Sequence, residues 1–310
     1  QEDCWVYVRQ GDDAKSVLDQ IAQDGKAETR GFWPDIAYRM YKLDRNLQRE
    51  LDGAYFLKTG TSMADALKKI IRHQQDAVRL TFIGTRTLEE LAGKMALCVE
   101  ADSASIRQAM YDPEFLSLSE CDSANVCSIF LPDTYQVYWN ITPRKLMVRM
   151  LSEYRKFWNS DRRLKADALG LTPQQVSILC SIAEEETANR QERGVVARLY
   201  WNRLQKGMPL QADPTVKYAV GDFTLRRILT SHLQVESPYN TYLHAGLPPG
   251  PIRVVEKASI NSFLDSTPHP YYYMCAKEDF SGRHNFAATL SEHNRNAARY
   301  HQALRRNGIR

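Results

Sequence analysis

A short strand that ends in glycine and leads into an amphipathic helix occurs three times near the start of the chain. The strands are expected at residues 5–11, 54–60 and 78–84, and each is followed by apolar residues at helical spacing. Thr61 or Ser62 is expected to cap the second helix. Because the spacing between the copies is unequal, the pattern does not predict a solenoid. It predicts two small strand–helix modules that lead into a larger domain, with an α+β fold overall.

Residues 101–135 are expected to be rich in loops. They contain Cys121 and Cys127, which flank a short polar segment. These two cysteines either close a disulfide in an oxidising compartment or remain free buried thiols. None of the six cysteines forms a C-x-x-C pair, which argues against a zinc or redox motif.

Three helices are expected downstream, at about 143–160, from Thr172 onward, and over 291–306 as a basic surface helix. The second is the best defined, because Thr172 is suited to the N-cap, a proline follows at the first helical position, and Gln175 completes a capping box. Between Arg203 and the last helix the chain is expected to be mostly loop, since prolines are frequent there.

The composition is that of an ordered globular protein, with 43% hydrophobic and 25% charged residues. Its 310 residues are enough for one large or two ordinary domains. The net charge of +4 weakly indicates anionic surroundings and lacks the dense basic patch that is typical of nucleic-acid binding. No apolar run in the sequence is long enough to span a membrane.

The best-defined helix ends with three consecutive glutamates, Glu184, Glu185 and Glu186. At ~100° per residue, Glu186 lies about 35° from the mean direction of the apolar side chains, and the other two lie about 125–135° from it. Glu186 is therefore expected to face inward, and its two neighbours to lie on a solvated face. An inward carboxyl group loses hydration, so its pKa rises and it can donate a proton near neutral pH. The alternative is a buried ion pair between Glu186 and Arg193 or Arg198.

Several segments resemble the MltG (YceG-like) family of endolytic murein transglycosylases. They are SIAEEETANRQERGVVARLYWNRLQKGMPLQADPTV at 181–216, SPYNTYLHAGLPPGPI at 237–252 and HNFAATLSEHN at 284–294. The resemblance is close over about 171–310 and looser upstream, where LPDTY at 131–135 resembles a Pro-Asp-Thr turn of the family. Two positions depart from the family pattern, because residue 185 is usually Lys and HNF at 284–286 usually reads HTF.

The resemblance implies an N-terminal LysM-like module, residues 1–77, followed by a YceG-like catalytic domain, residues 78–310, with a lysozyme-like active-site helix. It implies a lyase that cleaves the β-1,4 bond between N-acetylmuramic acid and N-acetylglucosamine within peptidoglycan strands and leaves 1,6-anhydro-muramic acid ends. It also implies that Glu186, the glutamate immediately before Thr187, is the single general acid and base. The helical direction selects the same residue.

Five residues in the family-like segments are candidates for binding the sugar: Gln211, Asp213, Tyr239, Asn240 and Thr241. Amides and hydroxyls can bind sugar hydroxyl and N-acetyl groups. The alternative is that these residues only form stable turns. Glu192 is either a neighbour that supports the site or a charge on a helix surface.

The histidines do not predict a metal site. His269, His284 and His293 are irregularly spaced, and no H-x-x-x-H pair is present. Neither a metal nor another cofactor is therefore expected.

The resemblance further implies peptidoglycan strands as the substrate and peptidoglycan synthases of the elongation or division machinery as partners. It implies the bacterial cell envelope as the location, with a transmembrane helix upstream of Gln1 that anchors the protein in the inner (cytoplasmic) membrane and leaves the catalytic domain outside the cytoplasm. Two rivals remain, a hydrolytic muramidase that activates a water and a peptidoglycan-binding scaffold. Nucleic-acid binding is the least favoured, since no groove-reading motif is present.

Overall fold

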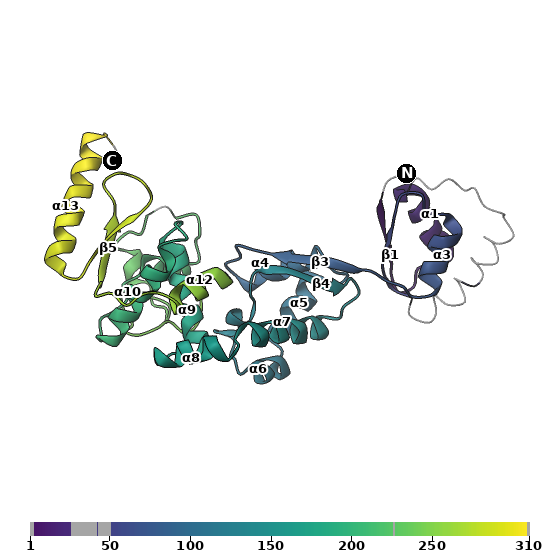
Figure 1. The fold of residues 1–310 in the computed structure, drawn as a ribbon, viewed down its shortest axis with the longest axis horizontal. Coiled ribbons are helices and arrows are strands. Elements are labelled where there is room, and N and C mark those ends of the chain that lie inside the picture. Colours follow the sequence, from purple (N-terminus) through teal and green to yellow (C-terminus); the bar gives the residue numbers. More distant parts are fainter. Residues whose placement is uncertain (1–2, 26–41, 43–50, 226, 309–310) are drawn as a thin grey trace. The chain divides into compact units, whose positions relative to one another are not determined.

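The computed structural model describes residues 3–25, 42, 51–225 and 227–308 (Figure 1). Within these residues the fold is α+β, with many short helices and three two-stranded antiparallel sheets. The chain divides into two compact units that alternate along the sequence. One comprises Gln1–Phe82, Ala92–Ile106 and Asp133–Leu146, and the other comprises Ile83–Leu91, Arg107–Pro132 and Met147–Arg310. The single boundary expected near residue 77 stays a prediction.

The first unit begins with the two expected strand–helix modules. Strand β1 (Cys4–Val8) leads to helix α1 (Ala14–Gly25), and β2 (Gly53–Leu57) leads to α3 (Met63–Ile71). The two strands pair antiparallel, with Cys4 opposite Leu57 and Val8 opposite Gly53. Ser62 caps α3 by accepting a hydrogen bond from the backbone N–H of Asp65 at 3.1 Å, which confirms one of the two expected caps.

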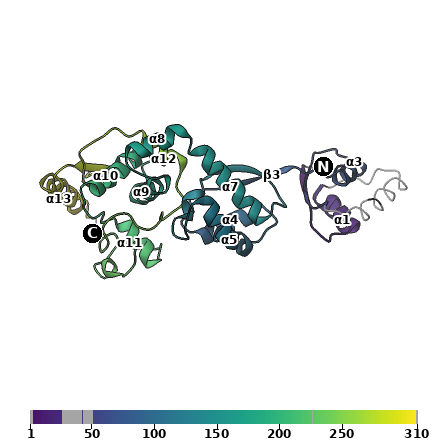
Figure 2. The same ribbon diagram turned by 90° about the horizontal axis from the view of Figure 1, so that it is seen from below.

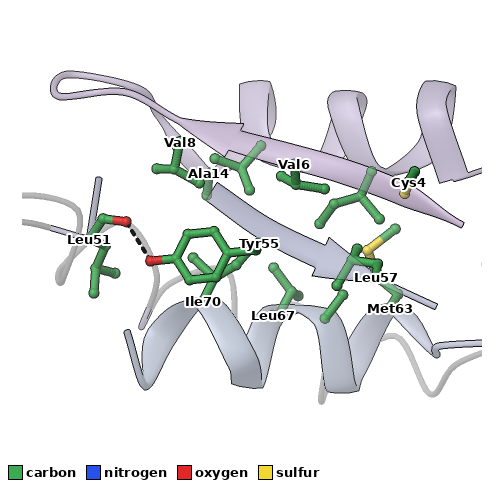
Figure 3. Close-up of a cluster of buried hydrophobic side chains, with 13 residues drawn as sticks. Cys4, Val6, Val8, Ala14, Leu51, Tyr55, Leu57, Met63, Leu67 and Ile70 are labelled. Carbon is green, nitrogen blue, oxygen red and sulfur yellow. Dashed lines mark hydrogen bonds between the residues drawn. The ribbon is translucent and has the colours of Figure 1, made fainter. Parts of the chain in front are cut away.

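A compact hydrophobic core joins these strands to their helices (Figure 3). Alternate residues of β1 point into it, because successive side chains of a strand face opposite sides. The hydroxyl of the buried Tyr55 donates a hydrogen bond to the carbonyl of Leu51 at 2.7 Å, so the one polar atom of that side chain is satisfied. The buried members of the core are Cys4, Val6, Val8, Ala14, Val17, Ile21, Leu51, Tyr55, Leu57, Met63, Ala66, Leu67 and Ile70.

The third expected strand pairs with a segment that the sequence had suggested was a turn. Strand β3 (Ala77–Phe82) pairs antiparallel with β4 (Asp133–Tyr138), with Phe82 opposite Asp133, and α4 (Leu88–Ala96) follows β3. The LPDTY segment at 131–135 therefore runs into a strand. In β4, Tyr135 and Val137 face inward and are buried, while Thr134, Gln136 and Tyr138 are exposed.

Residues 101–135 contain more structure than expected. Helices α5 (Ser103–Met110) and α6 (Pro113–Ser119) and the 3₁₀ helix η1 (Val126–Ile129) lie there. Asp112 caps α6 by accepting hydrogen bonds from the backbone N–H groups of Glu114 and Phe115. The loop prediction was wrong because a helix of two turns shows too few apolar residues for its periodicity to be recognised.

The second unit is mainly helical. Helix α7 (Pro143–Phe157) begins with one turn that belongs to the other unit. The later elements are α8 (Ser160–Ala168), α9 (Pro173–Glu186), α10 (Arg193–Gln205), α11 (Asp213–Val220), the 3₁₀ helix η2 (His232–Gln234), α12 (Lys257–Leu264), β5 (Tyr273–Ala276), β6 (His284–Ala287) and α13 (Leu290–Arg306). Helix α9 packs against α8, α10, α11 and α12, and α13 packs on the β5–β6 hairpin (Figures 1 and 2). The expectation of mostly loop after Arg203 is corrected by α11 and α12 and by this hairpin.

The start of α9 agrees with its sequence signature. The Thr172 hydroxyl accepts a hydrogen bond from the backbone N–H of Gln175 at 3.2 Å, and the Gln175 side chain accepts one from the Thr172 N–H at 2.9 Å. This reciprocal capping box is confirmed, and it satisfies two donors that helix formation leaves without partners. The helix ends at Glu186, because Thr187 is extended.

Cys121 and Cys127 do not form a disulfide in this structure, where both are free thiols. The Cys127 side chain is buried, and the Cys121 thiol receives a hydrogen bond from the Gln174 amide at 3.9 Å. Of the two alternatives for this pair, the structure shows the free thiols.

Gly250 lies against the backbone of another segment. A Cβ atom at this position would sit 1.8 Å from the carbonyl oxygen of Ala124. We expect Gly250→Ala to lower the free energy of unfolding by about 1–3 kcal/mol, because a backbone atom cannot move aside as a side chain can. Chemical denaturation measures the change.

Gly93→Ala is the matched control for this substitution. Gly93 lies inside α4, and a Cβ there would meet no atom within 4 Å. This change should stabilise the protein by up to about 1 kcal/mol through helix propensity. Equal effects of the two substitutions would contradict the steric explanation for Gly250.

Candidate active site

A cavity of about 320 Å³ opens beside the C-terminal end of α9, within the second unit. Its walls come from α9, α10, the start of α11, the loop around residue 242, strand β5 and helix α13. Most of the lining groups are polar or aromatic, and the polar ones can exchange hydrogen bonds with hydroxyl groups of a ligand. The lining residues are Glu186, Leu199, Tyr200, Arg203, Gln211, Asp213, Tyr242, Tyr273, Met274 and His293.

The Glu186 carboxyl group faces this cavity. Its oxygen Oε1 accepts a hydrogen bond of 2.6 Å from the hydroxyl of Tyr200, which is buried in α10. Removal from water raises the pKa of Glu186 to about 7, although the Tyr200 hydrogen bond and the charge of Arg203 oppose the rise and the charge of Asp213 adds to it. A carboxyl group with this pKa is protonated in a large share of molecules near neutral pH. It can therefore donate a proton to a bound ligand.

Asp213 is a second carboxylate in the same cavity. It occupies the first turn of α11, and its Oδ1 accepts a hydrogen bond of 2.6 Å from the Tyr242 hydroxyl. Gln211, two residues before it, has a left-handed backbone with a φ of 49°. The structure thus brings three of the six site residues expected from the sequence, Glu186, Gln211 and Asp213, to one cavity.

Tyr239, Asn240 and Thr241 are not among the residues that line this cavity, and their direct contact with a sugar stays a prediction. Asn240 is fully buried, and its amide donates hydrogen bonds to the carbonyls of Leu233 and Val235 at 3.0 and 2.9 Å. These bonds use both donors of the Asn240 side chain.

Asn240 and Thr241 support neighbours that do reach the cavity. The Asn240 side-chain oxygen accepts a hydrogen bond from the Tyr242 N–H at 3.0 Å. The carbonyl of Thr241 accepts one from the Gln211 N–H at 3.2 Å, and its hydroxyl accepts one from the Ala212 N–H at 3.0 Å. Asn240 and Thr241 thus hold the backbone of the segments that carry Tyr242 and Gln211.

Glu184 and Glu185 do not lie on a solvated face, which corrects a second expectation. The Glu184 side chain is 0% exposed and forms an ion pair with Arg253 at 3.0 Å. Glu185 accepts two hydrogen bonds from Arg86, at 3.1 and 3.0 Å, and one from Arg253 at 2.9 Å. The error arose because α9 packs against α8, α10, α11 and α12, so its buried surface is wider than one apolar stripe.

The ion-pair alternative for Glu186 applies to Glu184 instead. Arg193 lies 3.8 Å from Glu184 and 3.0 Å from Glu256. Arg198 donates hydrogen bonds to the hydroxyl and the carbonyl of Ser266. Neither arginine pairs with Glu186 among the contacts of the described residues, where the Tyr200 hydroxyl is its hydrogen-bond partner.

Sequence reasoning missed most of the aromatic and basic groups in the cavity. Arg203 is fixed by hydrogen bonds from its guanidinium to the carbonyls of Tyr272 and Leu210, at 2.6 and 2.8 Å, and it lies over the Tyr273 ring. The His293 ring stacks on Tyr273 with 5.5 Å between centroids. Tyr200, Arg203 and Tyr242 lie inside the family-like segments, and this was the only signal in the sequence that could have identified them.

The histidines considered earlier have separate surroundings. The Glu192 carboxylate accepts a hydrogen bond from the His284 ring at 2.9 Å, so Glu192 is a partner of the β5–β6 hairpin. Burial lowers the pKa of His293 and of His269. Within the described part of the chain, no group of three or more His, Cys, Asp and Glu side chains is placed to hold a metal ion.

None of the helices described there has the length and apolar character needed to cross a membrane.

Known proteins are similar to this chain in sequence. A model of the YceG-like family matches residues 6–299. An endolytic murein transglycosylase of Bacillus subtilis (strain 168) is 35% identical over 156 residues, which cover 50% of this chain and 41% of that protein. An endolytic murein transglycosylase of Streptococcus pneumoniae (serotype 2, strain D39) is 27% identical over 295 residues, which cover 86% of this chain and 53% of that protein. The chain thus spans about half the length of these curated relatives.

A solved structure shares the fold. The crystal structure of a yceG-like protein from Listeria monocytogenes matches with a TM-score of 0.62 and 23% sequence identity. The match covers 95% of this chain and 98% of that one. The arrangement of helices and small sheets is therefore one that a solved protein also adopts.

Proposed function

The chain belongs to the YceG-like family, and from this membership we propose that it is an endolytic peptidoglycan lytic transglycosylase. It would cleave the β-1,4 bond between N-acetylmuramic acid and N-acetylglucosamine within glycan strands and leave 1,6-anhydro-muramic acid ends. The observation that carries the proposal is Glu186, a carboxyl group with a pKa near 7 that faces a polar cavity. The names of the relatives support the substrate and the reaction.

The reaction needs one group that donates a proton and then accepts one. In the first step protonated Glu186 gives its proton to the glycosidic oxygen, and the bond from that oxygen to C1 of the muramyl residue breaks. The positive charge that develops on the sugar ring lies close to the carboxylate that has just formed. In the second step this carboxylate takes the proton of the muramyl C6 hydroxyl, whose oxygen bonds to C1. Glu186 ends the cycle protonated, so no cofactor and no second carboxylate are required.

The remaining cavity residues would bind and orient the sugar. Gln211 presents an amide, and Asp213 presents a carboxylate fixed by Tyr242, which are groups that bind sugar hydroxyls and N-acetyl groups. The rings of Tyr273 and Tyr242 offer flat apolar surfaces for a sugar face. Asn240 and Thr241 would act through the backbone that they hold, and Tyr239 would contact the sugar only if the strand extends beyond this cavity.

The envelope location and the N-terminal module are parts of the same proposal. The β1–α1 and β2–α3 modules would be a LysM-like unit that holds the enzyme on its polymer, and α9 would be the lysozyme-like active-site helix. Peptidoglycan synthases would be its partners. A membrane anchor would hold the catalytic domain outside the cytoplasm, at the inner membrane.

A hydrolytic muramidase is the second candidate, and Asp213 favours it. Glycosidases that activate a water use two carboxylates, and the cavity holds both Glu186 and Asp213. In that reaction water, rather than the C6 hydroxyl, would bond to C1. The product would then carry a reducing end instead of an anhydro end.

Digestion of purified sacculi, with the products weighed by mass spectrometry, tests the proposal. We expect wild-type protein to release fragments with anhydro-muramic ends, lighter by one water than hydrolysis products. Reducing ends in their place would establish the muramidase. Binding to sacculi with no release of fragments, and no difference between wild type and Glu186→Gln, would favour the scaffold alternative.

A further inference from the structure

The Tyr200 hydroxyl has a single hydrogen-bond partner among the described residues, Oε1 of Glu186 at 2.6 Å. Tyr200 is 3% exposed and lies in α10, one of the helices that pack against α9. Most buried hydroxyls direct their hydrogen to an acceptor, and for Tyr200 the acceptor is Glu186. The other carboxyl oxygen, Oε2, receives no hydrogen bond from the described residues.

We propose that Tyr200 is a positioning residue that keeps the catalytic proton of Glu186 on Oε2, the oxygen left for the substrate. This inference rests on the proposed function, because it assigns a role within the same reaction. A neutral carboxyl group has one oxygen that carries the proton and one that only accepts. Since Tyr200 donates to Oε1, Oε1 is the acceptor and the proton resides on Oε2.

The same hydrogen bond would also act in the second half of the reaction. Once Glu186 has given up its proton, the bond from Tyr200 becomes charge-assisted and stabilises the carboxylate. Oε1 stays occupied, so Oε2 is again the oxygen that takes the proton of the C6 hydroxyl. Donor and acceptor are thus one atom in both steps, and the sugar need not move between two oxygens.

The other charged and titratable groups around Glu186 do not compete for this role. Asp213 repels negative charge on Glu186, and Arg203 attracts it, but neither forms a hydrogen bond with it. The Tyr242 hydroxyl is committed to Asp213. His293 lines the same cavity, stacks on Tyr273 and has its pKa lowered by burial. On its own helix, Glu184 and Glu185 are held by arginines.

The test is the pH profile of Tyr200→Phe on purified glycan strands. The acid must be protonated, so wild-type kcat/KM falls as pH rises through the pKa of Glu186. Loss of a hydrogen bond to the charged form raises that pKa, and a bond of this kind is worth about one to two pKa units. We expect the pH at which kcat/KM falls to rise by about one unit. The plateau kcat should fall about tenfold, which is a part of the contribution of a positioned acid. KM should stay nearly constant.

Tyr154→Phe is the matched control. Tyr154 is also buried in the second unit, and its hydroxyl has no hydrogen-bond partner among the described residues. This substitution should leave both the alkaline limb and kcat at wild-type values. It separates loss of a buried hydroxyl in general from loss of the one that contacts Glu186.

Replacement of Tyr200 by 3-fluorotyrosine keeps the proposal testable if Tyr200→Phe does not fold. The fluorinated phenol is a stronger hydrogen-bond donor, so the alkaline limb should move to lower pH, opposite to the shift for Phe. An alkaline limb that stays at the wild-type pH, or a Phe variant with wild-type plateau kcat, overturns the proposal. The proposed function fails separately, if Glu186→Gln keeps wild-type activity.

Discussion

Glu186→Gln is expected to lower turnover on purified glycan strands by at least ~10²-fold, the lower end of what a general acid contributes. Glutamine is nearly isosteric and can still accept the hydrogen bond from Tyr200, so the fold should persist. Turnover and far-UV circular dichroism, measured on the same preparation, separate loss of chemistry from loss of structure. A folded variant that retains wild-type turnover would remove Glu186 from the reaction.

The same variant should gain thermal stability above neutral pH. Burial raises the pKa of Glu186 from 4.5 to about 7 in the folded state, so the folded state holds its proton more tightly than the unfolded chain does. The stability that this group contributes is complete below about pH 4.5 and is lost as the pH rises through about 7. Glutamine does not ionise, so Glu186→Gln should melt above wild type at pH 8, and by a clearly smaller margin at pH 5. A margin independent of pH would contradict the raised pKa.

The part of the candidate site that follows from local sequence is the start and end of α9. Its capping box depends on residues three apart, and the preference of Thr172 and Gln175 for such positions is a property of those residues. The inward direction of Glu186 follows from helix geometry and from the apolar residues of the same helix. Both were accessible to sequence reasoning because they involve one element only.

The contacts between elements could not be predicted from the sequence in the same way. Tyr200, Tyr242 and His293 reach the cavity from three different parts of the chain, and no periodicity links them to Glu186. The pairing of β3 with β4 likewise joins Phe82 to Asp133 across the intervening helices. Such pairs depend on how the elements pack, which local propensity does not determine.

Glu184 shows most clearly where the helical argument stops. A mean apolar direction assumes that one side of the helix is buried and the other is in water. In α9 the polar residues Ser177, Ser181 and Glu184 are buried as well. The Ser181 hydroxyl accepts a hydrogen bond from the Ile252 N–H at 3.1 Å, and Glu184 accepts one from the Glu256 N–H at 2.8 Å. The polar face of α9 is thus a packing surface for the segment from 250 to 256.

Glu184→Gln is therefore expected to lower the free energy of unfolding by about 2 kcal/mol, as when one partner of a buried charged hydrogen bond is removed. The side chain is fully buried, and Arg253 and Arg193 are only 13% and 9% exposed, so water cannot replace the lost charge. Arg253 keeps Glu185 as a partner and Arg193 keeps Glu256, which limits the loss. It corresponds to a fall in melting temperature of roughly 4–8 °C. Differential scanning calorimetry at pH 7 measures it.

Glu185→Gln is the control on the next residue of the same helix. Glu185 also pairs with arginines, but the side chain of Arg86 is 40% exposed, so solvent can compensate part of the loss. Its cost should be about 1 kcal/mol or less, as for ion pairs near the surface. The three consecutive glutamates then differ in what each substitution removes: stability at 184, little at 185, and turnover at 186. If Glu184→Gln melted at the same temperature as Glu185→Gln, the buried pair with Arg253 would not hold the end of α9. The fixed position of Glu186 would then have to come from its contact with Tyr200 and from the packing of α10 and α12.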